Sequence, residues 1–188
     1  MKENKQSQRT RNLIEQALIK LVLENDFESI SVTDICNKAL ITRATFYKYY
    51  EDKYHLMNCV FIEMKEKIFN DSLKHQSFNS SKELYIKIIE LCYDFITKNQ
   101  KKFSIFIKHS LNEKIEFMLL QNINDTIEEF IKKEKDNFKY NVPTEVASKF
   151  ITGGLAYLLF FIIENKKAYS KKEVMKWVEE MLSNTFNN

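Results

Sequence analysis

The chain has 188 residues, of which 44% are hydrophobic and 29% charged, and a formal net charge of +3. This composition excludes an intrinsically disordered chain, and the small net charge does not by itself indicate a nucleic-acid partner. The chain contains only two glycines and one proline. Because tight turns and strand-rich folds use many more of both, we expect an all-α fold.

The first predicted helix runs from about Thr10 to Glu24, with Thr10 as its expected N-cap. Its apolar residues recur at helical spacing and form one stripe: Leu13, Ile14, Ala17, Leu18, Leu21 and Val22. Phe27 and Ile30 follow and are expected to complete a small core. The arm before the helix is basic, with Lys2, Lys5, Arg9 and Arg11 against Glu3. For Lys2 and Lys5 we favour a solubilising tail over direct contact with a partner.

The segment from Ser31 to Lys53 predicts two short helices joined by a tight turn. Ser31 and Asp34 have the spacing of a capping box at the start of the first. The turn is Leu40-Ile41-Thr42, and the Thr42 hydroxyl can cap the second helix. The second helix, Arg43 to Tyr50, is expected to bury Phe46 and Tyr50. The side chains left outside are Arg43, Ala44, Thr45, Tyr47, Lys48 and Tyr49.

These outward side chains have the chemistry of a DNA-reading surface. An arginine fork can pair with guanine O6 and N7. Threonine and tyrosine hydroxyls and lysine can donate to phosphate oxygens, and a small residue such as Ala44 allows close approach to the bases. The alternative is a solvated helix with ordinary amphipathic aromatics, and composition alone does not separate the two.

The segment resembles the DNA-binding domain of the TetR family of bacterial transcriptional regulators. That family's pattern is Thr-x-x-Thr-Phe-Tyr-x-Tyr-Phe followed by x-x-Lys-x-x-Leu. Here it corresponds to Thr42–Tyr50 with Lys53 and Leu56, after a Ser31-Val32-Thr33-Asp34-Ile35-Cys36 start. The resemblance covers about Thr10 to Met57. The chain departs from the pattern where Leu40 and Asp26 replace usual glycines. Leucine in a turn that needs positive φ would be strained by about 1 kcal/mol.

The resemblance implies an N-terminal arm and helix-turn-helix DNA-binding domain over residues 1–53 and a helical regulatory and dimerisation domain over 54–188. It implies a cytoplasmic, homodimeric regulator, most simply a ligand-responsive repressor, acting on a palindromic operator in double-stranded DNA. We expect Arg43 to contact bases and Lys48 and Tyr49 to reach bases or phosphates. The other expected DNA-binding residues are Thr33, Ala44, Thr45, Tyr47 and Lys53. The alternative function is a helical small-molecule-binding or interaction module without specific DNA readout. A third possible function is the organisation of DNA or of protein partners without an effector.

The rest of the chain is expected to form six more helices. The fourth helix should start near Lys53, at a helix N-terminus that favours an anion such as phosphate, and a linker is expected over residues 70–81. Ser80 or Ser81 can cap the next helix, and Pro143 can open the eighth at its first position. The predicted ranges are 52–70, 81–99, 102–109, 114–136, 143–163 and 171–186.

The segment Leu155 to Ile163 is apolar on almost every face, so it is expected to be central or to face another subunit. Together with the amphipathic last helix it predicts a homodimer through the last two helices, as in the TetR family. The adjacent Gly153 and Gly154 each destabilise a helix by up to about 1 kcal/mol relative to alanine, which usually reflects a close backbone approach.

No motif for catalysis or for a cofactor is present. The three histidines are too scattered for a metal site. There is no phosphate-binding glycine loop or nucleophile elbow, so no enzyme activity and no cofactor are expected. The three cysteines are far apart and are expected to be reduced and buried. No signal peptide is expected, because the N-terminal residues are polar and lack an apolar stretch. No membrane partner is expected, because the longest apolar run, Leu155 to Ile163, is shorter than the roughly 20 residues of a membrane span. Aromatic residues in the second domain would suit an effector of unknown identity, and no ligand-binding residue is assigned.

Overall fold

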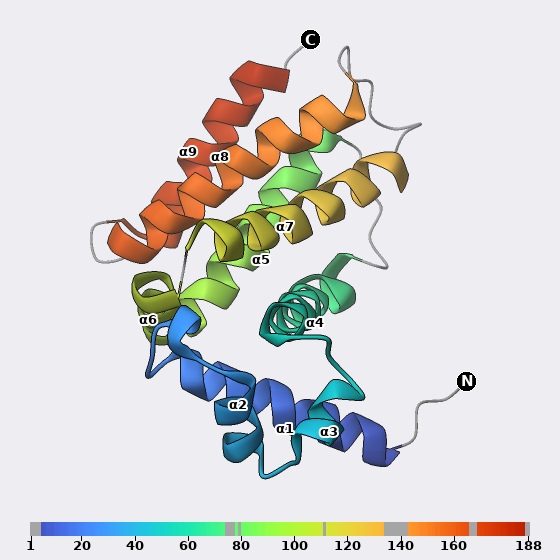
Figure 1. The fold of residues 1–188 in the computed structure, drawn as a ribbon. Coiled ribbons are helices and arrows are strands. Elements are labelled where there is room, and N and C mark those ends of the chain that lie inside the picture. The colour runs from blue at the N-terminus through green and yellow to red at the C-terminus, as the bar shows by residue number, and fades with distance from the viewer. Residues whose placement is uncertain are drawn as a thin grey trace. The chain divides into compact units, whose positions relative to one another are not determined.

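The computed structural model describes residues 5–73, 78, 80–110, 112–133, 143–165 and 169–186. These residues form α-helices and one short 3-10 helix, without a strand, which confirms the all-α prediction (Figure 1). The elements in chain order are α1 (Lys5–Val22), η1 (Phe27–Ser29), α2 (Val32–Ala39), α3 (Arg43–Tyr47), α4 (Lys53–Leu73), α5 (Ser81–Lys98), α6 (Gln100–Ser110), α7 (Glu113–Lys133), α8 (Thr144–Asn165) and α9 (Lys171–Phe186).

The chain divides into two compact units. The first comprises Met1–Glu63 and Ser104–Met118, and the second comprises Met64–Phe103 and Leu119–Asn188. Helices α4, α6 and α7 therefore each contribute residues to both units. The predicted domain boundary after Lys53 remains a prediction.

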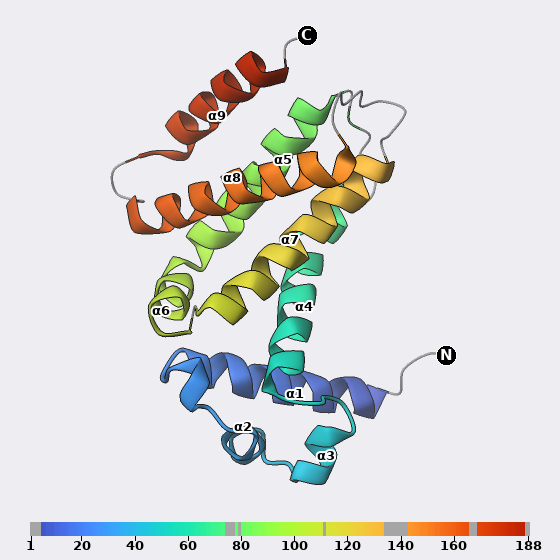
Figure 2. The same cartoon turned by 45° about the horizontal axis from the view of Figure 1, so that its top comes forward.

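The first unit is built on α1, α2 and α3. Helix α1 packs against α2, and α2 packs against α3 (Figure 2). Seven apolar side chains in its core are completely buried: Ile14, Leu18, Phe27, Ile35, Phe46, Leu56 and Ile115. Phe27 and Ile30 close this core, as predicted. Burial of each large apolar side chain stabilises a fold by about 1.5–3 kcal/mol, so this small unit has a well-defined interior.

Helix α1 begins at Lys5, five residues before the predicted start. Thr10 is not its N-cap: the Thr10 hydroxyl donates to the Gln6 carbonyl within the helix at 3.0 Å. That prediction was therefore wrong. The extra turn consists of residues with good helix propensity and is held from outside, because the Ser7 hydroxyl donates to the Tyr49 hydroxyl at 3.4 Å. Lys2 and Glu3 lie outside the described residues.

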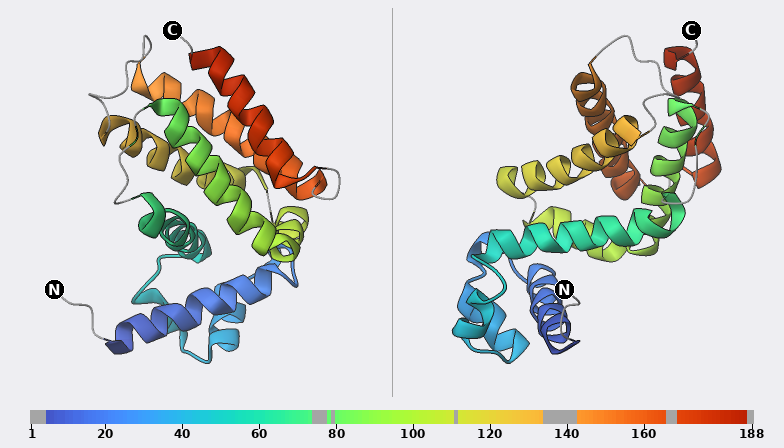
Figure 3. Two further views of the ribbon diagram at one scale, coloured as in Figure 1. Left: turned by 180° about the vertical axis from the view of Figure 1, so that it is seen from behind. Right: turned by 90° about the vertical axis from the view of Figure 1, so that its right-hand side faces the viewer.

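The second unit is built around α5, which packs against both α8 and α9 (Figure 3). Ser80 caps α5, since its side chain accepts from the Glu83 backbone N–H at 3.2 Å, which confirms the predicted cap. Lys171 of α9 pairs with Glu90 at 3.1 Å and with Asp94 at 2.8 Å, both on α5. The predicted linker over residues 70–81 was too long, because residues 70–73 still belong to α4; residues 74–77 and 79 lie outside the described residues.

Helix α8 is the most apolar helix of the described chain. By length and composition alone it could cross a membrane: one 18-residue window has a mean hydropathy of 1.9, and 44% of that window is buried within the chain. Core helices of globular proteins have the same properties. Because α8 packs on α5 and buries Leu155, Leu159 and Ile162, we interpret it as a core helix. Helix α8 begins at Thr144. Pro143 therefore lies just before the first helical residue, whereas the prediction placed it at the first helical position.

Candidate nucleic-acid interface

Two local capping motifs hold the helix-turn-helix in shape. The Ser31 hydroxyl accepts from the Asp34 N–H at 3.2 Å, and the Asp34 carboxylate accepts from the Ser31 N–H at 2.8 Å. The hydrogen bond from the Ser31 side chain lowers the pKa of Asp34. At the next helix the Thr42 hydroxyl accepts from the Thr45 N–H at 3.1 Å. Both predicted caps are confirmed, and each satisfies backbone N–H groups that a helix start would otherwise leave unpaired.

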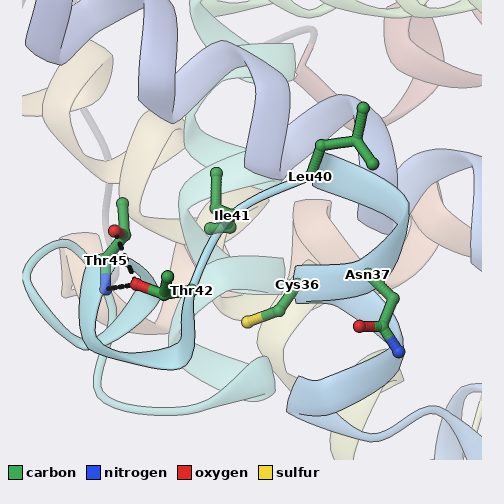
Figure 4. A pocket seen from close by; sticks show the side chains of 6 residues that line it. All are labelled: Cys36, Asn37, Leu40, Ile41, Thr42 and Thr45. Atoms are coloured by element: carbon green, nitrogen blue, oxygen red, sulfur yellow. Dashed lines mark hydrogen bonds between the residues drawn. The ribbon is translucent and has the colours of Figure 1, made fainter.

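The turn between α2 and α3 depends on Leu40. This residue ends α2 in the left-handed conformation, with φ 57° and ψ 45°, and is the single non-glycine residue with positive φ among the described residues. Its side chain is 92% exposed. Six side chains line a shallow hollow at the turn (Figure 4): Cys36, Asn37, Leu40, Ile41, Thr42 and Thr45. The predicted strain at Leu40 is therefore present and is not relieved by burial of the side chain.

Helix α3 presents one exposed face. Arg43, Ala44, Tyr47 and Lys48 are exposed, whereas Phe46 is completely buried. The exposed residues follow helical spacing, so their side chains lie on the same side. An Arg43 guanidinium nitrogen donates to the Tyr47 hydroxyl at 3.3 Å, and the guanidinium carbon lies 5.9 Å from the Tyr47 ring centroid. The arginine is thus partly oriented before any ligand arrives.

The other two predicted contact residues of this segment make intramolecular contacts. The Thr45 and Thr42 hydroxyls are hydrogen bonded at 2.9 Å. The half-buried Tyr49 lies against α1, where the Arg11 guanidinium is 5.3 Å from its ring centroid. Thr33 is exposed in the first turn of α2. The structure therefore brings Arg43, Ala44, Tyr47 and Lys48 together on one face and places Thr33, Thr45 and Tyr49 off that face.

The segment after α3 is anchored to α1 by a buried hydrogen bond. Tyr50 is 1% exposed, and its hydroxyl donates to Glu15 Oε1 at 2.8 Å. Burial raises the pKa of the Tyr50 hydroxyl, and Glu15 raises it further. Glu15 was missed in the sequence analysis. A carboxylate between Ile14 and the apolar pair Ala17-Leu18, within a helix whose other buried residues are all apolar, is the feature that could have indicated it.

The Lys53 side chain makes its hydrogen bonds within the first unit. Its ammonium donates to the backbone carbonyls of Phe27 at 2.9 Å, Glu28 at 2.9 Å and Ile30 at 3.0 Å. Its nitrogen also lies 4.8 Å from the Phe27 ring centroid, and its side chain is 15% exposed. An ammonium has three protons to donate, so these bonds use its full capacity. The predicted phosphate contact of Lys53 would have to replace at least one of them.

Glu28 joins η1 to two other elements of the first unit. Its carboxylate accepts from the Tyr54 hydroxyl of α4 at 2.9 Å and from the Asn112 side chain at 2.6 Å. Asn112 also caps α7, since its Oδ1 accepts from the Ile115 N–H at 2.9 Å. The Lys114 ammonium lies 3.2 Å from the Tyr54 ring centroid. We call Glu28, Tyr54, Asn112 and Lys114 the Glu28 cluster. It was not predicted, because Glu28 and Asn112, which are hydrogen bonded in it, lie 84 residues apart in the chain.

In the part of the chain that the structure describes, no group of three or more His, Cys, Asp or Glu side chains could hold a metal ion. The described residues form a capped helix-turn-helix, in which α3 carries an exposed face of basic and aromatic side chains, and a second helical unit. The fold and this face define a helix-turn-helix protein.

Comparison with protein-family models finds no match. The chain is similar to the HTH-type dhaKLM operon transcriptional activator DhaS of Lactococcus lactis, with 27% identity over 114 residues, 57% of this chain and 61% of DhaS. It is also similar to an uncharacterised HTH-type transcriptional regulator, YxbF, of Bacillus subtilis, with 34% identity over 65 residues, 33% of this chain and 17% of YxbF. The aligned segments thus span less than two thirds of either relative.

Solved structures cover nearly the whole chain. A TetR-family transcriptional regulator from Syntrophomonas wolfei has a TM-score of 0.71 at 17% identity, over 96% of both chains. NalD of Pseudomonas aeruginosa, the secondary repressor of the MexAB-OprM efflux pump, has a TM-score of 0.62 at 17% identity, also over 96% of both chains. FadR of Bacillus subtilis in complex with stearoyl-CoA has a TM-score of 0.59 at 17% identity, over 90% of this chain and 96% of FadR. The chain has the fold of TetR-family transcription regulators, and the resemblance noted in the sequence is confirmed.

Proposed function

We propose that this protein is a sequence-specific DNA-binding transcriptional regulator, in which α3 enters the major groove. The exposed face of α3 carries this proposal, because Arg43, Ala44, Tyr47 and Lys48 lie together on a helix whose other side is buried. Arg43 is the proposed base contact, since its fork matches guanine O6 and N7. Between Ile35 and Tyr50 the chain carries Lys38, Arg43 and Lys48 and no acidic residue, which suits the approach to phosphates.

The other predicted residues have supporting roles in this proposal. Thr33 and Tyr47 contact the phosphate backbone through their hydroxyls, and Lys48 contacts phosphate or a base edge. Thr45 and Tyr49 hold the recognition helix through their contacts with Thr42 and Arg11, and reach DNA only by leaving those partners. Lys53 acts chiefly through the carbonyls that it binds.

The acting form in this proposal is a homodimer through α8 and α9. The two helices leave large apolar side chains exposed in the single chain: Val146, Phe150, Tyr157 and Phe161 on α8, and Trp177 and Met181 on α9. The four α8 residues recur at helical spacing and form one stripe. A second copy that covers the same stripe would give an isologous interface and a roughly palindromic operator.

Regulation by a small molecule is also proposed, with repression as the outcome of DNA binding. NalD is a repressor and FadR is seen with stearoyl-CoA, which supports this class of regulator, whereas DhaS is an activator. The proposed site of action is the cytoplasm, and no catalytic activity is part of the proposal.

The test is a titration of the purified full chain against duplex DNA from its own upstream region and against a scrambled duplex, at one stated salt concentration. Affinity for the first that is at least about a thousandfold higher supports a specific regulator. Arg43→Ala should reduce this preference by about 1–3 kcal/mol. The matched control Lys101→Ala removes one positive charge from an exposed position of the second unit and should leave the preference unchanged.

If the wild-type protein binds both duplexes equally and weakly, the selection of duplexes from a random library decides between the two functions. Enrichment of a palindromic sequence would place the operator elsewhere in the genome. No enrichment would refute specific readout and support the alternative, a helical small-molecule-binding or interaction module.

A further inference from the structure

Arg43 and Tyr47 form a pair on the exposed face of α3. Arg43 Nη2 donates to the Tyr47 hydroxyl at 3.3 Å, and the guanidinium carbon lies 5.9 Å from the centroid of the Tyr47 ring. The two residues are four positions apart in one helix, which is a spacing at which side chains meet. Within the described part of the chain, neither side chain makes another hydrogen bond or an ion pair. The position of the guanidinium therefore depends on this one partner.

The Tyr47 ring is in turn positioned by the core of the first unit. The centroids of the Phe46 and Tyr47 rings are 5.4 Å apart, and the ring planes are 88° apart, the edge-to-face arrangement that aromatic rings prefer. Phe46 is completely buried, whereas Tyr47 is half exposed. A buried phenylalanine thus orients Tyr47, and Tyr47 orients an arginine that faces solvent.

The hydrogen-bonding capacity of the pair is only partly used. A phenol oxygen can accept while its proton donates. The Tyr47 oxygen accepts from Arg43, so its proton remains available for a phosphate oxygen. Arginine has five N–H donors, and after one bond to Tyr47 enough remain for a bidentate contact with guanine O6 and N7. A phosphate and a guanine can therefore both be bound while the hydrogen bond between Arg43 and Tyr47 persists.

The length of this hydrogen bond restricts which phosphate can take part. With an O–H···O bond of about 2.7 Å, the phosphate oxygen lies no more than about 6 Å from Arg43 Nη2. Phosphates of one strand are spaced about 3.4 Å apart along the DNA axis, so this phosphate lies within about two nucleotides of the guanine. Hydrogen bonds in a chain polarise one another, and donation to a charged phosphate makes the Tyr47 oxygen a stronger acceptor for Arg43.

We propose that Tyr47 is the positioning residue for Arg43 and couples base readout to a phosphate contact. When the Tyr47 proton is bound to phosphate, the Tyr47 oxygen holds the guanidinium in the orientation that pairs with guanine. The inference rests on the proposed function and adds one feature to it. A phosphate is the same at every base pair and carries no sequence information by itself, yet through Arg43 this phosphate contact strengthens the preference for one base.

The first test substitutes Tyr47 in the full chain, with an operator selected from random duplexes. The guanine that Arg43 reads is the position at which Arg43→Ala loses the preference for G·C over A·T. Tyr47→Phe keeps the aromatic ring and removes the hydroxyl. We expect the preference at this position to fall at least about fivefold, the usual size of one lost hydrogen bond. The melting temperature should stay that of the wild type, since Tyr47 is half exposed. A preference in Tyr47→Phe equal to that of the wild type would overturn the proposal.

The second test removes the charge of single phosphates. An uncharged methylphosphonate is placed at each position within two nucleotides of the guanine, in a G·C duplex and in the matching A·T duplex. At one position, the wild type should lose at least about threefold more affinity for the G·C duplex than for the A·T duplex, and Tyr47→Phe should lose the same from both. Equal losses by the wild type at every position would show that the phosphate contact is independent of Arg43 and would overturn the coupling.

Thr33→Val is the matched control. Thr33 is also a proposed phosphate contact through a hydroxyl, but it lies in the first turn of α2, and no hydrogen bond among the described residues joins it to Arg43. This variant should weaken binding to both duplexes alike and keep the preference for G·C. A loss of preference as large as that of Tyr47→Phe would overturn the positioning role, since the loss of any phosphate contact would then have the same effect.

The outcomes separate this inference from the proposed function. A wild-type protein that prefers no sequence would refute the proposed function, and the inference with it. A wild-type protein that prefers its operator, together with a Tyr47→Phe variant that keeps the full preference for G·C, would refute the inference alone.

Discussion

Leu40 has a backbone conformation that glycine adopts without steric strain. An L-residue in the left-handed region is destabilised by about 1–2 kcal/mol, and Leu40 recovers none of this through burial because its side chain is 92% exposed. We expect Leu40→Gly to raise the free energy of unfolding by about 0.5–1 kcal/mol, since the freedom that glycine adds to the unfolded chain offsets part of the relief. Urea denaturation measures this difference.

Leu40→Ala is the control for this prediction. Alanine also has a Cβ atom, so it keeps the strained conformation while it removes most of the exposed side chain. It should leave the free energy of unfolding within about 0.5 kcal/mol of the wild type. Equal stabilisation by alanine and glycine would show that the exposed side chain, and not the backbone angle, is unfavourable.

Substitution of Lys53 tests whether this charged residue at the start of α4 contacts DNA or stabilises the fold. Lys53→Met keeps the apolar stem and removes the three hydrogen bonds to the carbonyls of Phe27, Glu28 and Ile30. We expect the free energy of unfolding to fall by about 1–3 kcal/mol, the range for hydrogen bonds of charged groups. Lys48→Met, at the exposed C-cap position of α3, should change it by less than about 0.5 kcal/mol.

The salt dependence of DNA affinity separates the two roles of these lysines. A direct phosphate contact contributes about one unit to the slope of log affinity against log salt. We expect Lys48→Met to reduce the slope and Lys53→Met to leave it unchanged. A shallower slope for Lys53→Met at unchanged stability would support the phosphate contact predicted from sequence.

At the scale of the element, the first turn of α7 belongs to the first unit, together with the helix-turn-helix. Asn112 both caps α7 and donates to Glu28, which in turn accepts from Tyr54 at the start of α4. A movement of the first turn of α7 would therefore be transmitted to η1, whose carbonyls accept hydrogen bonds from Lys53. This continuous set of contacts lies within the first unit and gives α7 a physical means to influence the helix-turn-helix.

Asn112→Asp is predicted to break this connection with almost no change in shape. Aspartate caps a helix as well as asparagine does, but it cannot donate to Glu28 and places a second negative charge beside it. We expect the free energy of unfolding to fall by about 1–2 kcal/mol, as expected when a hydrogen bond to a charged group is replaced by like-charge contact. Asn112→Ser keeps the cap without the added charge and should lose less. Equal losses for the two variants would mean that repulsion between residue 112 and the Glu28 carboxylate contributes nothing.

The helices and their local caps could be predicted from sequence, and the partners of the site residues could not. Ser31, Thr42 and Ser80 cap helices as their spacing to the following residues indicates, because a cap depends only on neighbours in the chain. The start of α1 was predicted five residues late, because its first turn is held by Tyr49, 42 residues away. The Glu28 cluster likewise depends on packing between distant segments, which hydrophobic periodicity does not specify.

At the scale of the whole molecule, the apolar stripe on α8 (Val146, Phe150, Tyr157 and Phe161) is a surface of the second unit that the single chain leaves exposed. Phe150 and Tyr157 are each 77% exposed, and Gly154 lies between them on the same side of the helix. A Cβ atom built on Gly154 meets no heavy atom within 4 Å, so nothing in the single chain requires a glycine there. In a dimer, this glycine would let a second α8 approach closely at the centre of the stripe.

Tyr157→Glu places a charge on this stripe and should convert the dimer to a monomer. A buried unpaired carboxylate at an interface costs several kcal/mol, whereas the same residue on an exposed surface changes stability by about 0.5 kcal/mol or less. We expect light scattering to give the mass of one chain for the variant and of two chains for the wild type. Lys149→Glu, exposed on α8 outside the stripe, is the control and should stay dimeric. A wild-type protein that is monomeric at micromolar concentration would contradict the dimer. If the dimer is the acting form, the Tyr157→Glu monomer should also bind a palindromic operator at least about a hundredfold more weakly, since it loses the gain in effective concentration from two linked sites.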